Sequence, residues 1–249
     1  FSRYMSTITD FDRPELQVGP NSAFLLKEGE DYGSFYGETF MTSLTQLSPN
    51  VNFGEYSINS RGYVIDGNGA AQVLLDEDGN PVNTKIGNTT PEFNMSFNTT
   101  FIYKNFSFYA LVDWSQGGDI YNATTQYQYR DLTSPDFDNS ASENLTTDYF
   151  ASLYNTNKTS AAFVEDGTFV KLREVNLSYN LPSVALNNTF IKSAKFSIIG
   201  RNLLTITDYS GADPEVADIT QSGDLSSYKF DNFGFPATST FSASVLLKF

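Results

Sequence analysis

The chain contains no cysteine and no histidine among its 249 residues. Without cysteine there is no disulfide framework and no thiolate zinc site. Without histidine, neither a Ser-His-Asp or Cys-His catalytic arrangement nor a histidine-ligated metal can form within this chain. General acid–base chemistry would be left to carboxylates, lysine or tyrosine. We therefore expect no enzyme activity, no catalytic residue, no metal site and no cofactor.

Basic residues are scarce as well. Lys and Arg number 15 against 29 Asp and Glu, which gives a formal net charge of -14. This charge repels nucleic-acid backbones, so a nucleic-acid partner is not expected. The acidic residues gather in polar stretches that are typical of loops, at residues 10–15, 28–31, 76–78, 131–148 and 208–231.

Long hydrophobic runs are missing. No stretch approaches the roughly 18 apolar residues of a membrane-spanning helix, and no secretory leader is recognisable. Aromatic residues nevertheless make up 15% of the chain, with 22 Phe and 15 Tyr, at a mean hydropathy of -0.30. Large apolar side chains interleaved with Asn, Ser and Thr favour strands with one apolar and one wet face.

The clearest strand pattern lies in residues 91–115. Apolar side chains alternate with polar ones from Pro91 to Tyr103, and the alternation resumes at Phe106 after a two-residue turn, Lys104-Asn105. Each arm has about ten residues or more, which is longer than most strands of soluble proteins and matches the ~9–11 residues that cross a bilayer. Tyr103 and Phe106 fit an aromatic girdle at a membrane interface.

Three further stretches have strand character. From Val175 to Leu181 apolar residues alternate with polar ones, after a slip between Leu172 and Val175 that suggests a bulge or the membrane rim. In residues 193–207 Phe196 and Ile198 oppose Lys195 and Ser197, but the phase after Gly200 is ambiguous. In residues 237–249 an apolar stripe is broken only by a leucine on the polar face, and its members are Phe241, Ala243, Val245, Leu247 and Phe249.

The connections alternate in length. Lys104-Asn105 and residues 182–193 are short, whereas residues 117–166 and 208–236 are long and polar. This alternation is typical of an outer-membrane barrel, whose long loops are extracellular and whose short turns face the periplasm. Two long structureless loops would be unusual in a soluble protein. No repeat of fixed period supports a solenoid or propeller.

Several groups of polar residues could be taken for a calcium site or a catalytic site, but simpler interpretations are favoured. The acidic turns at residues 66–69 and 76–80 lack EF-hand spacing, so calcium binding is not favoured. The same holds for the acidic residues of the last long loop, Asp208, Asp213, Glu215 and Asp218, which we expect to be solvated. Glu165 and Asp166 are neighbours on a strand and point apart, which argues against a glycosidase pair. Aromatic residues lining a sugar site would lie in the long loops, for example Tyr121, Tyr127 and Tyr129.

Six segments, in order, resemble the C-terminal barrel region of SusC/RagA-type TonB-dependent outer-membrane transporters, the nutrient importers of Bacteroidetes. They are GSFYG (33–37), DEDGN followed by IGNTTPEF (76–80 and 86–93), YKNFSFYALVDWSQGGDIYN (103–122), FVEDGTFVKLREVNLSYNLP (163–182), GRNLLTITDYSGADPEV (200–216) and GFPATSTFSASVLLKF (234–249).

The resemblance implies an all-β fold, an antiparallel transmembrane β-barrel of 22 strands with an N-terminal plug. Residues 1–249 would form the C-terminal portion of that barrel, eight to ten strands, with the plug and the earlier strands outside this chain. The resemblance also implies import of oligosaccharides or peptides across the outer membrane of a Gram-negative, Bacteroidetes-like bacterium. Implied partners are a SusD-like surface lipoprotein that closes over the barrel as a lid, the TonB complex and outer-membrane lipid.

Two groups of residues are candidates for roles in such a barrel. The polar positions of the long strands are expected to face the lumen, namely Asn94, Ser96, Asn98, Thr100, Asn176 and Ser178. The terminal stripe resembles the signal read by the barrel-assembly machinery, carried by Phe241, Val245, Leu247 and Phe249. Two alternatives stay open: a barrel scaffold or adhesin that transports nothing, and a soluble β-sandwich that binds carbohydrate.

Overall fold

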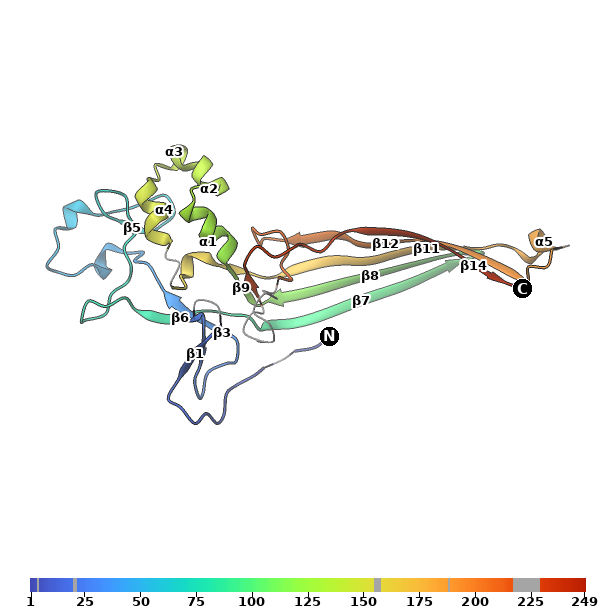
Figure 1. Cartoon of the computed structure of the whole chain (residues 1–249), viewed down its shortest axis with the longest axis horizontal. Helices are drawn as coiled ribbons and strands as arrows, with labels where there is room; N and C mark the ends of the chain where they lie inside the picture. The colour runs from blue at the N-terminus through green and yellow to red at the C-terminus, as the bar shows by residue number, and fades with distance from the viewer. Residues whose placement is uncertain (4, 20–21, 155–157, 188, 217–228) are drawn as a thin grey trace.

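The computed structural model describes the chain apart from residues 4, 20–21, 155–157, 188 and 217–228. Figure 1 shows a long, narrow sheet that projects from a head of short strands and helices. No helix in the described part of the chain is long and apolar enough to cross a membrane.

The long sheet has five strands, in the spatial order β14-β12-β11-β8-β7, and each neighbouring pair is antiparallel. The strands are β7 (Pro91–Tyr103), β8 (Phe106–Gly117), β11 (Phe169–Asn180), β12 (Ser193–Thr207) and β14 (Thr240–Lys248). Their lengths run from 9 to 15 residues, which confirms the expected long strands and the two-residue turn between β7 and β8.

The connections confirm the expected alternation. At the end of the sheet far from the head, β7 turns directly into β8, and β11 reaches β12 through a segment that holds the short helix α5 (Ser183–Leu186). At the other end, residues 118–168 and 208–239 make the long connections. The expected number of barrel strands is wrong: the described residues form five strands of this length, because the chain before Pro91 makes only short strands.

The predicted slip in the third strand is a β-bulge. The pairing of β11 with both β8 and β12 shifts between Leu172 and Glu174. Against β8 the extra residue is Arg173, whereas against β12 the extra residue is on β12, where Asn202 and Leu203 lie opposite Arg173. On β12 the irregularity falls after Gly200, where Asn202 has a positive φ of 51°. The extra residue moves each following side chain to the face opposite the one that strict alternation would give it. Val175, Leu177 and Tyr179 therefore share the face of Leu172.

The described residues of the head form three small sheets and four helices. One sheet contains β1 (Leu16–Val18), β2 (Phe24–Leu26), β3 (Ser34–Glu38) and β6 (Asn83–Asn88); a hairpin contains β4 (Ser57–Ile58) and β5 (Val64–Ile65). The third sheet contains β10 (Val164–Asp166), β9 (Asp119–Asn122) and β13 (Phe230–Asp231), and β13 runs parallel to β9. The helices are α1 (Ala123–Arg130), α2 (Pro135–Asp138), α3 (Ser140–Glu143) and α4 (Thr147–Leu153), and short 3-10 turns lie at Leu44–Gln46, Phe53–Glu55 and Ala161–Phe163.

Polar side chains cap the first turns of three of these helices, and aromatic side chains pack the helices onto the core of the head. Asn122, Ser134 and Thr146 accept hydrogen bonds from backbone N–H groups in the first turns of α1, α2 and α4. The helices pack around an aromatic core. Its fully buried members include Phe35, Tyr121, Phe150, Phe163 and Phe230. The first long connection is therefore a folded unit and not a structureless loop.

A glycine at the start of the head lets the chain leave the sheet. Gly118, directly after β8, has a positive φ of 78°. A Cβ atom at this position would lie 2.8 Å from the carbonyl oxygen of Thr89. Only glycine satisfies both conditions without strain, and β9 can therefore turn into the head.

Candidate functional site

The strand register sorts the side chains of the long sheet onto two faces, since residues that pair directly on neighbouring strands point to the same side. One face, which we call the apolar face, collects most of the large hydrophobic residues. They are Met95, Phe97, Phe101, Tyr103, Phe106, Phe108, Trp114, Leu177, Tyr179, Phe196, Ile198, Phe241, Val245 and Leu247.

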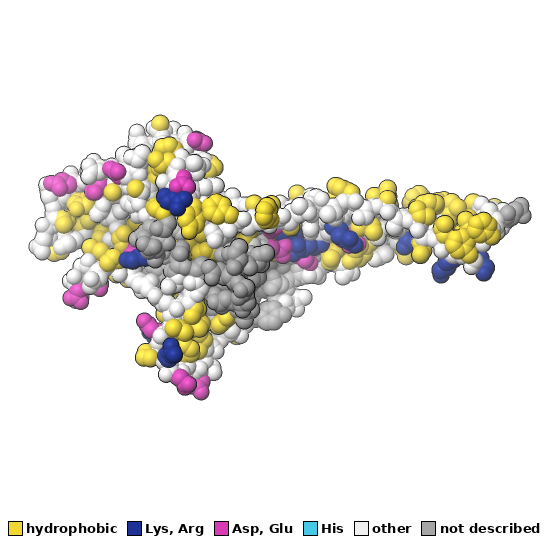
Figure 2. Space-filling view, in the orientation of Figure 1, with side chains coloured by type: hydrophobic (Ala, Val, Ile, Leu, Met, Phe, Trp, Pro, Cys, Tyr) yellow, Lys and Arg dark blue, Asp and Glu magenta, His cyan; other side chains and the backbone are white. Residues whose placement is uncertain are grey.

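The apolar face is exposed. The exposed fraction is 65% for Phe97, 64% for Ile198 and 76% for Phe241. Figure 2 shows hydrophobic side chains along the sheet to its far end. A continuous apolar surface of this size marks contact with a membrane or another protein. Three of the four terminal-stripe residues belong to it, and the fourth, Phe249, follows β14.

The opposite face, which we call the polar face, carries all six residues predicted to point into a lumen. Asn94, Ser96, Asn98 and Thr100 occupy it on β7, and Asn176 and Ser178 occupy it on β11. The Ser178 hydroxyl donates to Asn176 Oδ1 at 2.9 Å and lies 3.0 Å from the Ser197 hydroxyl of β12. The sheet thus brings polar groups from separate strands together on one side.

A cluster of charged residues, which we call the charge cluster, occupies the polar face next to the head. Lys171 and Arg173 come from β11, Asp113 from β8, and Asp213 and Glu215 from the last long connection. Lys171 Nζ donates to Asp213 Oδ1 at 2.6 Å and to Glu215 Oε2 at 2.7 Å. Arg173 donates through Nε to Asp113 Oδ2 and through Nη1 to Glu215 Oε2, each at 2.7 Å. Both cations therefore contact the same carboxylate, that of Glu215.

The charge cluster attaches the last long connection to the sheet. Asp213 Oδ2 also accepts a hydrogen bond from the backbone N–H of Ala237 at 2.9 Å, and Lys229 Nζ donates to the carbonyl oxygen of Pro214 at 2.8 Å. Lys171 and Asp213 are 2% and 7% exposed. Burial lowers the pKa of Lys229 to about 8. The expectation that Asp213 and Glu215 are solvated is wrong, because both are ion-paired, while Asp218 lies outside the described residues.

The attachment of the last long connection to the sheet by the charge cluster is expected to weaken at acidic pH. Burial alone would raise the pKa values of Asp213 and Glu215, but hydrogen bonds and charges from Lys171 and Arg173 outweigh it and hold both pKa values below their ordinary 3.8 and 4.5. The unfolded state then binds more protons than the folded state, so this contribution is complete above about pH 5 and is lost as the pH falls below about 4. Thermal unfolding measured from pH 7 to pH 3 checks this, since D213N/E215Q should remove the acid-dependent part of the decline. An equal decline in the variant would contradict it.

The tyrosines proposed to line a sugar site occupy different places. Tyr121 is fully buried, and its hydroxyl donates to Gln126 Oε1 at 2.8 Å. Tyr129 is 7% exposed and packs edge-on against Phe150. The prediction is wrong for these two, because the folded head needs their rings in its core. Tyr127 is partly exposed, and the Arg130 guanidinium lies 5.0 Å from its ring centroid.

The acidic stretches at residues 66–69 and 76–80 form turns, as expected. Asp66 Oδ1 accepts hydrogen bonds from the backbone N–H groups of Asn68 and Ala70, and Asp76 Oδ1 accepts from those of Asp78 and Asn80. These carboxylates serve the turns themselves.

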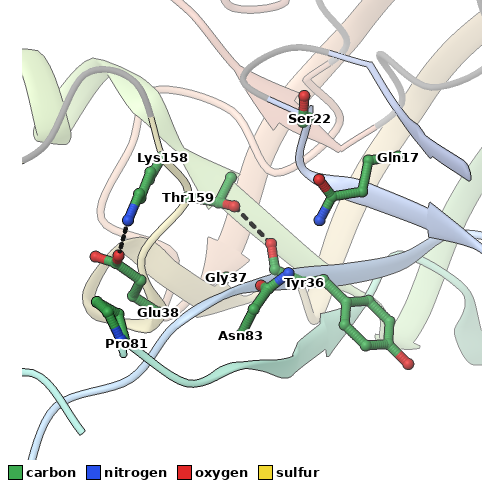
Figure 3. Close-up of a pocket in the computed structure, with 9 residues that line it drawn as sticks. All are labelled: Gln17, Ser22, Tyr36, Gly37, Glu38, Pro81, Asn83, Lys158 and Thr159. Atoms are coloured by element: carbon green, nitrogen blue, oxygen red, sulfur yellow. Dashed lines mark hydrogen bonds and ion pairs between the residues drawn. The ribbon is translucent and has the colours of Figure 1, made fainter. Parts of the chain in front are cut away.

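A polar pocket of about 310 Å³ lies in the head between β1, β3, β6 and the segment at Lys158. Figure 3 shows Lys158 Nζ beside Glu38 Oε1, at 2.5 Å, and the Thr159 hydroxyl donating to the Tyr36 carbonyl oxygen. The amides of Gln17 and Asn83 line the same pocket. The sequence offers no periodic signal for this pocket, since its residues are brought together by pairing over more than 100 positions.

Comparison with known proteins places the sheet and its head in a family. TonB-dependent receptor P3 of Formosa agariphila is 31% identical over 239 residues, which cover 90% of this chain and 23% of that receptor. TonB-dependent receptor P39 of the same organism is 26% identical over 242 residues. The RagAB peptide importer in its open-open state has a similar fold, with a TM-score of 0.64 at 19% identity over 98% of this chain and 25% of the solved one.

The chain belongs to the TonB-dependent receptor family. The resemblance seen in the sequence is thereby confirmed, and so is the antiparallel barrel as its fold class. The chain spans about a quarter of the length of the curated relatives it matches. No protein-family model matches it.

Sequence reasoning missed the charge cluster of this receptor segment, although a signal was present. In the stretch FVKLREV, three charged residues, Lys171, Arg173 and Glu174, interrupt an otherwise uncharged strand. Charged side chains are costly on a membrane strand unless they face away from lipid and find partners. That argument predicts a paired cluster on the polar face, but it does not identify Asp213 and Glu215 as the partners.

Proposed function

We propose that this segment is barrel wall in an outer-membrane transporter that uses TonB-coupled energy to import peptides or oligosaccharides. One observation carries the proposal: five adjoining strands, long enough for a bilayer, expose a continuous apolar face opposite a polar one. A transmembrane barrel needs this arrangement, with lipid outside and water inside. Support for a peptide cargo comes from the RagAB structures, which are described as those of a peptide importer.

In this proposal the apolar face contacts lipid, and the six polar-face residues line the lumen. The head lies outside the cell and the short turns lie at the periplasmic end, because long loops of such barrels are extracellular. Residues 1–249 form the C-terminal portion of the barrel, whose assembly signal includes Phe241, Val245, Leu247 and Phe249. A SusD-like lipoprotein covers the extracellular side, and contact with TonB belongs to other parts of the receptor.

Cysteine labelling in native outer membranes tests the two faces. The segment contains no cysteine, so each introduced thiol reports on one site. We expect a membrane-impermeant maleimide to label Asn94→Cys and Asn98→Cys of the polar face several-fold faster than Phe97→Cys and Phe101→Cys of the apolar face. The neighbours Phe97 and Asn98 form a matched pair, because they occupy the same depth on opposite faces. Faster labelling of the apolar face, or a polar face closed to the reagent, would refute the arrangement.

Uptake distinguishes a transporter from a scaffold or adhesin built on the same barrel. Cells that express the complete receptor are expected to accumulate a fluorescent peptide mixture or oligosaccharide mixture, and deletion of TonB should abolish the accumulation. If the two faces are labelled as expected but no TonB-dependent uptake occurs, the barrel arrangement would still hold and the scaffold or adhesin would be favoured.

A further inference from the structure

The charged side chains in the far half of the long sheet are all positive. Beyond the level of Asp113 and Glu174, residues 93–112, 175–200 and 237–249 contain no Asp, Glu or Arg, although the chain as a whole has a net charge of -14. They contain four lysines, Lys104, Lys192, Lys195 and Lys248. In the described part of the chain, none of them forms an ion pair with an Asp or Glu side chain. Figure 2 shows basic side chains next to a hydrophobic group at this end.

Two of these lysines lie beside aromatic rings. Lys104 Nζ is 5.4 Å from the centroid of the Tyr103 ring, which belongs to the apolar face. Lys192 Nζ donates to the main-chain oxygen of Phe249 at 3.1 Å, and the Phe249 ring stacks on Phe190 at 5.5 Å. Both ammonium groups thus lie where the apolar surface ends. The other two lysines differ, because the register puts Lys195 and Lys248 on the polar face.

We propose that Lys104 and Lys192 bind the phosphate groups of anionic phospholipids in the leaflet at the short-turn end of the barrel. The inference rests on the proposed membrane-spanning role of the sheet. Aromatic side chains at the rim of an apolar band settle at the headgroup level, and neighbouring lysines extend their ammonium groups toward the lipid phosphates. Lysines at the membrane surface without acidic neighbours attract anionic lipid in particular. An acidic protein partner is less well matched, because the lysines adjoin an apolar surface that fits acyl chains.

Native mass spectrometry of the complete receptor in mild detergent tests the proposal, with dioleoyl-phosphatidylglycerol and dioleoyl-phosphatidylethanolamine as probes. We expect the wild-type receptor to retain phosphatidylglycerol in preference to phosphatidylethanolamine. K104Q/K192Q should reduce bound phosphatidylglycerol several-fold, whereas the matched control K195Q/K248Q, with the same change in charge, should leave it unaltered. K104R/K192R should retain binding, which separates the loss of charge from a folding defect. Addition of inorganic phosphate should compete weakly, since the acyl chains share the apolar face.

The inference would be overturned by unchanged phosphatidylglycerol binding in K104Q/K192Q, by an equal loss in K195Q/K248Q, or by full displacement with inorganic phosphate alone. Failure of the proposed function gives a different result. A wild-type receptor that is soluble without detergent and retains neither lipid would refute the membrane barrel itself. A wild-type receptor that retains both lipids equally would refute only the role of the lysines.

Discussion

Lys171→Ala is expected to destabilise the folded receptor by about 3–5 kcal/mol, because it removes one member of a buried ion pair and leaves the other without its partner. The Lys171 side chain is 2% exposed, and its ammonium group contacts both Asp213 and Glu215. Arg173 still reaches Glu215 in the variant, but Asp213 keeps only backbone donors. The loss should appear first as release of the last long connection from the polar face.

Two measurements on the complete receptor in detergent check this prediction. Thermal unfolding should begin at a lower temperature, and hydrogen exchange should accelerate at residues 213–216 and 229–237 before it accelerates in the strands. Lys195→Ala is the control, since Lys195 lies on the same face without an ion pair in the described part of the chain. K171M/D213N/E215Q should recover part of the loss by removing the buried carboxylates. A Lys171→Ala receptor as stable as the control would mean that the charge cluster does not hold the connection.

Phe97→Arg is expected to destabilise the barrel by about 2–4 kcal/mol, which is the cost of an arginine at the bilayer midplane on a lipid-facing strand position. Phe97 is the central residue of the 13-residue strand β7 and is 65% exposed on the apolar face. In a membrane its ring contacts acyl chains, and a guanidinium at that depth has no water to solvate it. The equilibrium between unfolded and folded receptor in phospholipid vesicles, titrated with guanidinium chloride, measures the effect.

Asn98→Arg is the matched control for this substitution. Asn98 is the next residue of the same strand, is also exposed and lies on the polar face. An arginine there remains in the wet lumen, so its effect should stay within about 0.5 kcal/mol. An equal loss of stability in Phe97→Arg and Asn98→Arg would show that both faces are in contact with the same medium, which would contradict the membrane barrel.

The strands of the sheet could be predicted from local patterning, because a two-residue period needs no information from distant residues. The Lys104-Asn105 turn, the irregularity near Arg173 and the two faces of β7 and β8 all followed from that period. The six polar residues proposed for the lumen were found in the same way and do share one face, although their contact with water stays a prediction. Prediction from alternation failed before Pro91, because the strands there have only two to six residues and are too short to show a recognisable alternation.

The long two-faced strands, the alternation of short and long connections and the family could all be read from the sequence, since each depends on residue order over short distances. The roles of the long connections became visible only in the folded molecule. Tyr121 and Phe150 are buried because segments far apart in the chain pack into one aromatic core. Asp213 and Glu215 are ion-paired because the last connection folds back onto β11. Such contacts depend on which distant segments meet in space, and no local pattern of side chains specifies that.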